Sequence, residues 1–263
     1  MRKRTYIESL RLGSRLTRPA ITRAMDALAL PAGSVGLDVG CGVGQQTRWL
    51  AERVGPEGRV TGLDLSAEHV AAAREPPIPE NVELVEGDLR RLPFEDRAFD
   101  WAWCADTLWP VVITDPVSVV RGLARVIRPG GSLTLIYWSG EALLPGFPEL
   151  QARMAQGFAR RYLSGTEEQH SMRALHWMSE VGLERGRAES YLIEVRAPLS
   201  PELRELLAFT FSMLWCELEP YVPAEDWQTL TRLTDPDGPE FIGDRADYYG
   251  YVVYTAFTAR VPR

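Results

Sequence analysis

A glycine-rich turn that follows an acidic residue is the first stretch whose residue types and spacing suggest chemistry. An apolar run ends at Asp38, and a helix-compatible segment begins near Gln45. Between them glycines occupy every second position, where they let the backbone turn sharply and approach a ligand. The free N–H groups of a helix start favour polar ligand groups. The glycines are Gly40, Gly42 and Gly44.

The spacing of this turn discriminates between two kinds of nucleotide ligand. A dinucleotide-binding turn uses the pattern G-x-G-x-x-G and stands close to a negative pyrophosphate. Here the spacing is G-x-G-x-G, followed by Gln45 and Gln46, so the third glycine of that pattern is absent. Asp38 also places an acid where a dinucleotide fold keeps an apolar strand residue. The turn therefore favours a ligand that carries a positive charge.

The elements that must position this turn alternate between strand and helix. Strands are predicted at 35–40, 59–64, 82–86, 99–104 and 132–138, with helices at 44–54, 67–74 and 116–127 between them. Such alternation indicates a parallel sheet built from βαβ units. Ligands of open sheets bind beyond the carboxyl ends of the strands. Asp38, Asp64, Asp88 and Asp106 all fall at predicted strand ends, so we expect them to converge on one site.

The rest of the chain is expected to surround this sheet. Residues 5–29 predict two short helices interrupted at Pro19. After residue 138 the rhythm breaks, and the pattern predicts a cap over the strand ends with two more strands. The predicted segments are helices at 149–163, 167–182 and 201–218, strands at 189–196 and 248–258, and a proline- and acid-rich stretch at 219–247.

Composition limits the class of protein and its partners. The 263 residues are 45% apolar and 25% charged, with a net charge of −7 that disfavours phosphate-mediated nucleic-acid binding. No apolar run approaches the roughly 20 residues of a membrane span, and no signal peptide is predicted. Scattered cysteines without a C-x-x-C pair argue for a reducing, cytoplasmic setting and against a zinc site. We expect a monomer or homodimer that binds a small molecule, with no nucleic acid, membrane or metal partner.

The basic residues within 1–26 fit either a solvated helix face or a flap that meets an anionic substrate.

Several segments, taken in order, resemble class I S-adenosylmethionine-dependent methyltransferases. The resemblance is greatest to the small-molecule group that includes the ubiquinone and menaquinone C-methyltransferases. It implies an α/β, Rossmann-like sheet of order 3-2-1-4-5-7-6 with an antiparallel seventh strand and helical cap insertions. The matching segments are LDVGCGVG at 37–44, GLDLS at 62–66, EGDL at 86–89, LPFEDRAFD at 92–100 and LARVIRPGG at 123–131.

The resemblance assigns the cofactor contacts position by position. Asp38 would face the α-ammonium of S-adenosylmethionine, and Asp64 would accept both ribose hydroxyls, as charge-assisted contacts. Asp88 would accept from the adenine amino group. The remaining implied contacts are Gly40, Cys41 (a small buried residue, not a nucleophile) and Gly42 in the turn, Leu65 on the adenine face, Leu89 through its N–H, Cys104 through its carbonyl and Tyr6 as a closing aromatic. The resemblance covers about 35–138 and matches no subgroup over 139–263. With the residue pattern on either side, we expect an N-terminal helical flap (1–33), a cofactor-binding core (34–139) and a completion of the sheet with helical cap insertions on the substrate side (140–263).

Methyl transfer to a small, apolar or aromatic molecule, on O, N or C, is the expected function. The product of the cofactor would be S-adenosylhomocysteine. The alternatives are a fold relative that cyclises or cleaves the cofactor, and a non-catalytic partner subunit. No D/N-P-P-Y/F motif follows the fourth predicted strand, which argues against amide methylation.

No catalytic base is assigned from the sequence. The candidates His69, His170, His176, Asp106 and Tyr137 each have a plausible packing or capping role instead. The aromatic side chains expected around the mouth of the substrate pocket are Trp109, Trp138, Phe147 and Trp215.

Overall fold

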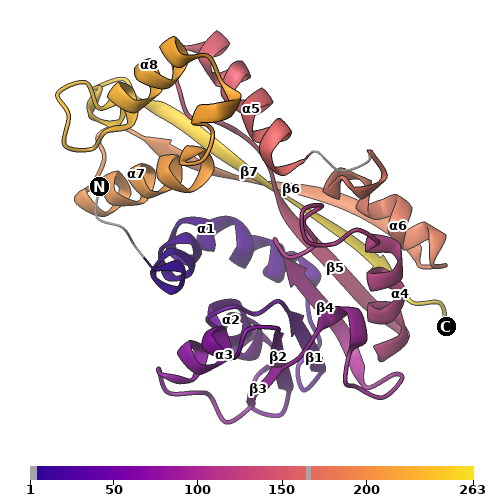
Figure 1. Cartoon of the computed structure of the whole chain (residues 1–263). Helices are drawn as coiled ribbons and strands as arrows, with labels where there is room; N and C mark the ends of the chain where they lie inside the picture. Colours follow the sequence, from indigo (N-terminus) through magenta and orange to yellow (C-terminus); the bar gives the residue numbers. More distant parts are fainter. Residues whose placement is uncertain (1–4, 164–166) are drawn as a thin grey trace.

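A single seven-stranded sheet organises the computed structural model, which describes residues 5–163 and 167–263 (Figure 1). The strand order is β3-β2-β1-β4-β5-β7-β6, as the resemblance implied. The first five strands are mutually parallel, and β7 runs antiparallel to both of its neighbours. The strands are β1 (Val35–Val39), β2 (Arg59–Asp64), β3 (Val82–Glu86), β4 (Phe99–Ala105), β5 (Ile127–Ala142), β6 (Glu184–Arg196) and β7 (Tyr249–Arg260).

The register brings the predicted strand ends together. Val39 at the end of β1 lies opposite Leu63 of β2 and Cys104 of β4. Asp64 at the end of β2 lies opposite Glu86 of β3. The carboxyl ends of β1, β2, β3 and β4 therefore form one edge, where a ligand of an open sheet binds.

Helices cover both faces of the sheet because its strands bury side chains on both sides. Helices α1 (Tyr6–Leu28) and α2 (Gln45–Val54) pack on one face, and Trp49 and Leu50 of α2 are buried there. On the other face α4 (Pro116–Val126) and α6 (Ala174–Glu180) pack over Leu37 and Leu135. Beside β3 lies α3 (Ala67–Arg74), with a small apolar cluster of its own.

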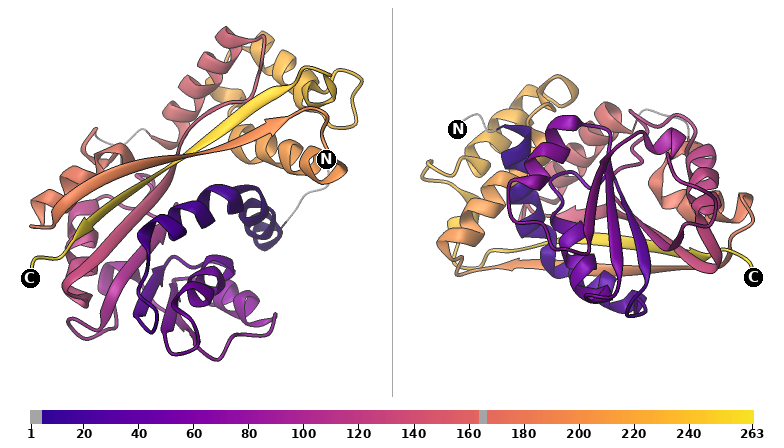
Figure 2. Two further views of the ribbon diagram at one scale, coloured as in Figure 1. Left: turned by 180° about the vertical axis from the view of Figure 1, so that it is seen from behind. Right: turned by 90° about the horizontal axis from the view of Figure 1, so that it is seen from below.

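Three long strands carry the cap. β5, β6 and β7 run past the ends of β1 to β4, and α5 (Pro148–Tyr162), α7 (Pro201–Trp215) and α8 (Ala224–Thr234) gather around their extension (Figures 1 and 2). The first helix, α1, lies between this cap and the glycine turn, and it contacts both β6 and α7. The predicted strands 132–138 and 189–196 are too short. β5 continues to pair with β7 beyond the sheet's parallel half, and β6 begins five residues earlier, where it pairs with the last residues of β7.

The prediction of two short N-terminal helices is wrong. One helix, α1, runs through Pro19, with Leu16 buried before the proline and Ile21 and Met25 buried after it. Proline removes one backbone hydrogen bond, and burial of this continuous apolar stripe outweighs that loss. A Thr5–Glu8 capping box starts the helix.

Two further predictions in the cap need correction. The helix expected at 167–182 is instead two short 3₁₀ turns, Glu167–Gln169 and Ser171–Arg173, followed by α6. The stretch 219–247 contains α8, which begins directly after Pro223 and carries the acids Glu225 and Asp226 in its first turn, where acids favour a helix.

Candidate active site

The glycine turn adopts the backbone that its residues permit. Gly40, Gly42 and Gly44 all have positive φ values, of 73°, 53° and 70°. A β-carbon on Gly40 would lie 2.3 Å from the hydroxyl oxygen of Thr107. The segment after β4 therefore crosses directly over the turn, and only glycine fits at position 40.

Asp38 is a buried acid at the base of the turn. Its side chain is 2% exposed and accepts a hydrogen bond from the Thr47 hydroxyl at 2.7 Å. Burial raises the pKa of Asp38 to about 7, against the opposing effect of the Thr47 hydrogen bond. A cation placed beside this carboxyl would be strongly favoured, because it offsets the cost of the buried charge.

Asp64 links the end of β2 to the glycine turn. Its Oδ2 accepts from the Gly42 N–H at 2.8 Å. Its Oδ1 accepts from the Ser66 N–H at 2.9 Å and lies 3.1 Å from Nδ1 of His69. A carboxylate offers about four acceptor positions, so one position remains for a ribose hydroxyl while His69 keeps its contact. The expected acceptance of both hydroxyls stays a prediction, and it requires the His69 ring to yield its contact.

The N-terminus of α1 brings Tyr6 over the end of β2. Its ring stacks on His69 with centroids 5.3 Å apart, and it remains 67% exposed. Beside Asp64, Leu65 is 59% exposed. Tyr6 comes from α1 and Leu65 follows β2, so two separate segments bring large, exposed side chains near the Asp64 carboxylate. This arrangement suits a flat aromatic ligand group such as adenine.

Asp88 and Leu89 begin a 3₁₀ turn after β3. The carboxylate of Asp88 accepts from the Arg90 backbone N–H at 2.8 Å, and the Arg90 guanidinium lies 2.8 Å away. Hydrogen bonding from Arg90 holds the pKa of Asp88 below its usual value. An adenine amino group would have to share this carboxylate with Arg90, so the expected contact remains a prediction.

The two cysteines of the site are buried thiols. Cys41 is 7% exposed and Cys104 is fully buried. Burial raises the pKa of Cys41 far above its usual value and that of Cys104 to about 12. Both thiols are therefore un-ionised and poorly nucleophilic near neutral pH, as expected for Cys41.

A polar network that the sequence did not reveal surrounds Asp106. This residue follows β4 with a positive φ of 48°. Its Oδ1 accepts from the Trp138 backbone N–H at 2.9 Å, and its Oδ2 accepts from the Tyr254 hydroxyl at 2.8 Å. The indole N–H of Trp138 donates to Glu141 at 2.8 Å. The partners come from β5 and β7, so the only sequence signal was the position of Asp106 at a strand end.

The predicted pocket aromatics separate into three environments. Trp109 donates its indole N–H to the Asp106 carbonyl at 2.7 Å, and Trp138 belongs to the same network. Phe147 is half-buried, with the Arg245 guanidinium 5.5 Å from its ring centre. Trp215 is 2% exposed and stacks on Phe211 in the core of the cap. Only the first two are brought beside Asp106.

Of the candidate bases, the three histidines lie away from Asp106. His69 contacts Asp64, His170 caps a 3₁₀ turn, and His176 faces Glu180 on the surface of α6. Tyr137 is fully buried on β5. Within residues 5–163 and 167–263, no group of acids, histidines and cysteines has the arrangement of a metal site, and no helix is long and apolar enough to cross a membrane.

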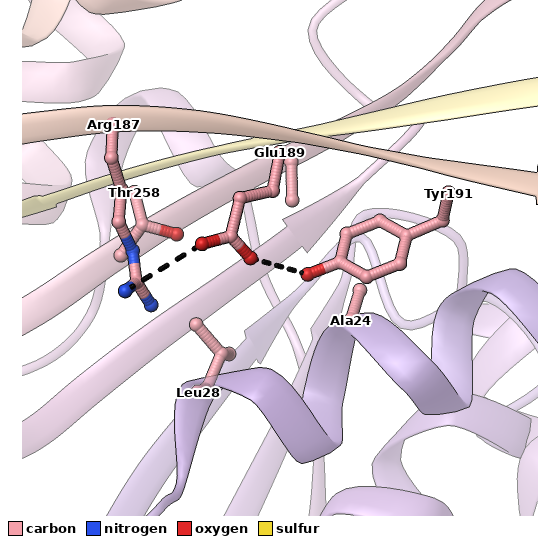
Figure 3. Close-up of a pocket in the computed structure, with 7 residues that line it drawn as sticks. Ala24, Leu28, Arg187, Glu189, Tyr191 and Thr258 are labelled. Atoms are coloured by element: carbon pink, nitrogen blue, oxygen red, sulfur yellow. Dashed lines mark hydrogen bonds and ion pairs between the residues drawn. The ribbon is translucent and has the colours of Figure 1, made fainter.

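A small hollow lies under α1, away from these residues (Figure 3). It encloses about 190 Å³, open solvent included, between Ala24 and Leu28 of α1 and the strands β6 and β7. Arg187, Glu189 and Tyr191 meet there through an ion pair and a hydrogen bond. Thr258 in its wall pairs with Thr134 in the middle of β5.

Comparison with known proteins identifies the family of the core. Residues 37–135 match the model of a family described as a methyltransferase domain. The chain therefore contains a methyltransferase domain. The cofactor of such a domain, in the class I fold described above, is S-adenosylmethionine.

Curated relatives and solved structures agree with this identification. Demethylmenaquinone methyltransferases from Staphylococcus aureus strains JH9 and Newman are 37% identical to this chain over 131 residues. The aligned residues are 49% of the chain and 53% of each relative. The chain thus spans about half the length of the curated relatives that it matches.

Solved structures share the fold at lower sequence identity. A putative methyltransferase from Bacillus halodurans covers 92% of the chain, and 99% of that protein is matched, with a TM-score of 0.58 and 20% identity. A SAM-dependent methyltransferase from Aquifex aeolicus covers 70% of the chain and 90% of itself, with a TM-score of 0.55 and 24% identity. The [4+2]-cyclase SpnF covers 92% and 80%, with a TM-score of 0.51 and 24% identity. These likenesses show the fold alone.

The residues at the strand ends fit S-adenosylmethionine. The buried carboxyl of Asp38 suits an ammonium group, and the glycine turn lets a ligand reach the main chain. Asp64 keeps one acceptor position for a hydroxyl. Tyr6 and Leu65 offer exposed faces for a ring. The site thus offers an acid for the ammonium group, an acceptor for a sugar hydroxyl and apolar faces for the adenine ring.

Proposed function

We propose that the protein transfers the methyl group of S-adenosylmethionine to a small apolar or aromatic molecule, on O, N or C. The observation that carries the proposal is the meeting of Asp38, Asp64 and the glycine turn at one edge of the sheet, beneath Tyr6 of α1. The family match over 37–135 and the relatives named as demethylmenaquinone methyltransferases support it.

The chain's own residues would bind, orient and enclose the reactants. S-adenosylmethionine supplies an activated methyl group on a sulfonium. Asp38 would hold the ammonium end, and Asp64 with His69 would fix the sugar. Tyr6 and the first turns of α1 would cover the adenosine side and exclude water. Trp109 and Trp138, on the segments after β4 and in β5, would then orient the acceptor for in-line transfer.

We also propose a role for each of the three parts of the chain. Residues 1–33 would act as a helical flap, 34–139 as the cofactor-binding core and 140–263 as the substrate side. The predicted cofactor contacts through Leu89 and the Cys104 carbonyl, and pocket roles for Phe147 and Trp215, belong to the same proposal. Free cysteines support a reducing, cytoplasmic setting, and the net charge of −7 supports an acceptor other than nucleic acid. We expect a monomer or homodimer.

Product analysis tests the proposed function. The protein is first titrated with S-adenosylhomocysteine by calorimetry, and then incubated with S-adenosylmethionine and reduced demethylmenaquinone or soluble naphthohydroquinone. Stoichiometric S-adenosylhomocysteine and a methylated acceptor are expected. Absence of binding would instead support a non-catalytic subunit. Consumption of the cofactor without S-adenosylhomocysteine would support cyclisation or cleavage.

A further inference from the structure

We propose that Asp106 is the catalytic base of the methyl transfer and that it acts on a hydroxyl group of the aromatic acceptor proposed above. This inference rests on the proposed function and deepens it. Asp106 would take the proton of the acceptor as the oxygen, or the ring carbon that it activates, attacks the methyl group. Tyr254 would be a positioning residue that holds the Asp106 carboxylate.

The location of Asp106 places it beside the reacting end of the cofactor site. It directly precedes Thr107, whose hydroxyl would lie 2.3 Å from a β-carbon on Gly40. The same hydroxyl donates to the Ala105 carbonyl at 2.8 Å, which fixes the chain over the glycine turn. Asp106 is thus adjacent to the turn that would carry the methionine part of the cofactor.

The backbone of Asp106 lies in the left-handed region and is held there by contacts on both sides. A φ of 48° is uncommon for a residue other than glycine, and such strain persists where the surroundings impose it. Here the N–H of Asp106 donates to the Ile136 carbonyl at 2.9 Å, and its carbonyl accepts from Trp109. Contacts on both sides of the residue therefore hold its side chain in one direction.

The carboxylate is held but not saturated. Each oxygen accepts one hydrogen bond, from the Trp138 N–H or the Tyr254 hydroxyl. A carboxylate has about four acceptor positions, so each oxygen keeps one free. Asp106 itself is half-buried, whereas Tyr254 is 3% exposed. The free acceptor positions of this network therefore belong to the Asp106 carboxylate.

The charges around Asp106 suit a base that works near neutral pH. Burial raises the pKa of Asp106 to about 6, although both hydrogen bonds oppose the shift. The neighbouring titratable groups are Cys104 on β4, Tyr137 on β5 and Tyr254 on β7, and burial raises the pKa of each. All three are neutral near pH 7, so Asp106 carries the local charge. Beyond the Trp138 ring, Glu141 has a pKa that burial also raises.

The aromatic surroundings favour an aromatic acceptor. The ring of Trp109 meets Phe158 edge-on with centroids 6.5 Å apart. Trp138 meets Tyr254 in the same manner at 5.8 Å. Both tryptophans are half-buried and attached to the Asp106 network through hydrogen bonds. A planar ring between such side chains would present its hydroxyl to the free acceptor positions of Asp106.

The proposed step is balanced. The O–H bond of the acceptor breaks, and its proton goes to an Asp106 oxygen. The bond between the methyl carbon and sulfur breaks as the carbon joins the acceptor, and the bonding pair remains on sulfur as a neutral thioether. For attack by a ring carbon, the ring then loses a proton to solvent, and the oxygen takes up a proton from solvent to restore the hydroxyl. No oxidant or reductant takes part, and Asp106 returns its proton to water.

Kinetics of the Asp106→Asn variant test the role of the base. The acceptors are naphthohydroquinone and catechol under anaerobic conditions, with n-propylamine as an aliphatic comparison. In the wild type we expect methylation of the two aromatic diols and a kcat that falls below about pH 6. Asp106→Asn should lower kcat about a hundredfold or more and abolish that acidic limb. Its affinity for S-adenosylhomocysteine and its melting temperature should stay close to the wild-type values.

Two further variants separate catalysis from structure. Tyr254→Phe removes one donor to the carboxylate, and its acidic limb should move upward by about one pH unit while kcat at high pH is largely kept. Asp115→Asn serves as the matched control, because Asp115 is an exposed cap of α4 and asparagine caps equally well. Its pH profile should be that of the wild type.

The outcomes divide cleanly between the two proposals. Wild-type protein that neither binds S-adenosylhomocysteine nor transfers a methyl group contradicts the proposed function itself. Binding with methylation of propylamine alone, or of no acceptor in the set, overturns the aromatic-hydroxyl class. Turnover of the diols with an unchanged kcat and acidic limb in Asp106→Asn overturns the role of Asp106 as the base.

Discussion

The carboxylate of Asp64 and the backbone N–H of Gly42 are joined by a hydrogen bond of 2.8 Å. This contact ties the end of β2 to the glycine turn after β1, so the carboxylate that we propose for the sugar also holds the turn. It also means that losing the Asp64 side chain would affect the shape of the turn as well as a direct ligand contact.

Replacement of Asp64 should weaken cofactor binding. Asp64→Ala removes charge-assisted hydrogen bonds, and we expect the affinity for S-adenosylhomocysteine to fall by about 1.5–3 kcal/mol. Isothermal titration calorimetry measures the change. Asp96→Ala is the control, since Asp96 is an exposed acid paired with Arg125. An unchanged affinity in Asp64→Ala would refute the assignment to the ribose.

His69 should contribute to the same site through Asp64. His69→Met keeps an apolar surface under Tyr6 but removes the ring nitrogen that lies 3.1 Å from Asp64. We expect a loss of about 0.5–1.5 kcal/mol in S-adenosylhomocysteine binding. His176→Gln, on the surface of α6 opposite Glu180, should bind as the wild type does. Tighter binding in His69→Met would instead show that His69 competes with the ribose for the carboxylate.

Cofactor binding should depend on pH through Asp38. Its pKa is raised to about 7 by burial, and an ammonium ligand favours the ionised carboxylate. Affinity should therefore be full at about pH 8 and fall by up to tenfold per pH unit below about pH 6, with proton release on binding. Calorimetry in buffers of different ionisation enthalpy measures the released proton. Asp38→Asn should bind more weakly and with little pH dependence. If the affinity of this variant still falls with decreasing pH, a group other than Asp38 releases the proton.

The same shift has a consequence for the unliganded protein. Because folded Asp38 binds its proton more tightly than the unfolded chain does, its contribution to stability is complete below about pH 4 and is lost as the pH rises through about 7. Urea denaturation of wild type and Asp38→Asn across this range isolates the contribution. The stability of the variant relative to the wild type should rise with pH; a fall would contradict the direction of the shift.

Truncation of two tryptophans should separate core from pocket. Trp215→Ala removes a side chain that is 2% exposed and stacked on Phe211, so it should lower the free energy of unfolding by about 3–5 kcal/mol. Trp109→Ala removes a half-buried ring beside Asp106 and should raise KM for an aromatic acceptor with a smaller loss of stability. Chemical denaturation and steady-state kinetics give the two quantities. A raised KM with unchanged stability in Trp215→Ala would show that Trp215 lines the substrate pocket rather than the core of the cap.

The cofactor edge could be predicted because its signals are local, whereas the sheet order was implied by the family resemblance. Each strand, turn and helix from β1 to β4 is a short segment with its own pattern, and Asp38 and Asp64 stand at the ends of their strands. Parallel βαβ connection then brings such ends to one edge. The length of α1 could not be read in this way, because burial on both sides of Pro19 depends on the sheet and the cap that the helix packs against.

The sequence by itself determined the strand–turn–helix unit at Asp38, the acids at the following strand ends and the class of cofactor that such a unit serves. Tertiary structure alone decided which aromatic side chains meet Asp106. Tyr254 lies 148 residues from Asp106 in the chain and reaches it only because β7 inserts antiparallel beside β5. Trp138 reaches the acid through its backbone N–H because β5 pairs with β4, whereas Trp215 on α7 packs on Phe211 in the core of the cap. Residue type set what each side chain could do, and strand pairing set which of them face the same space.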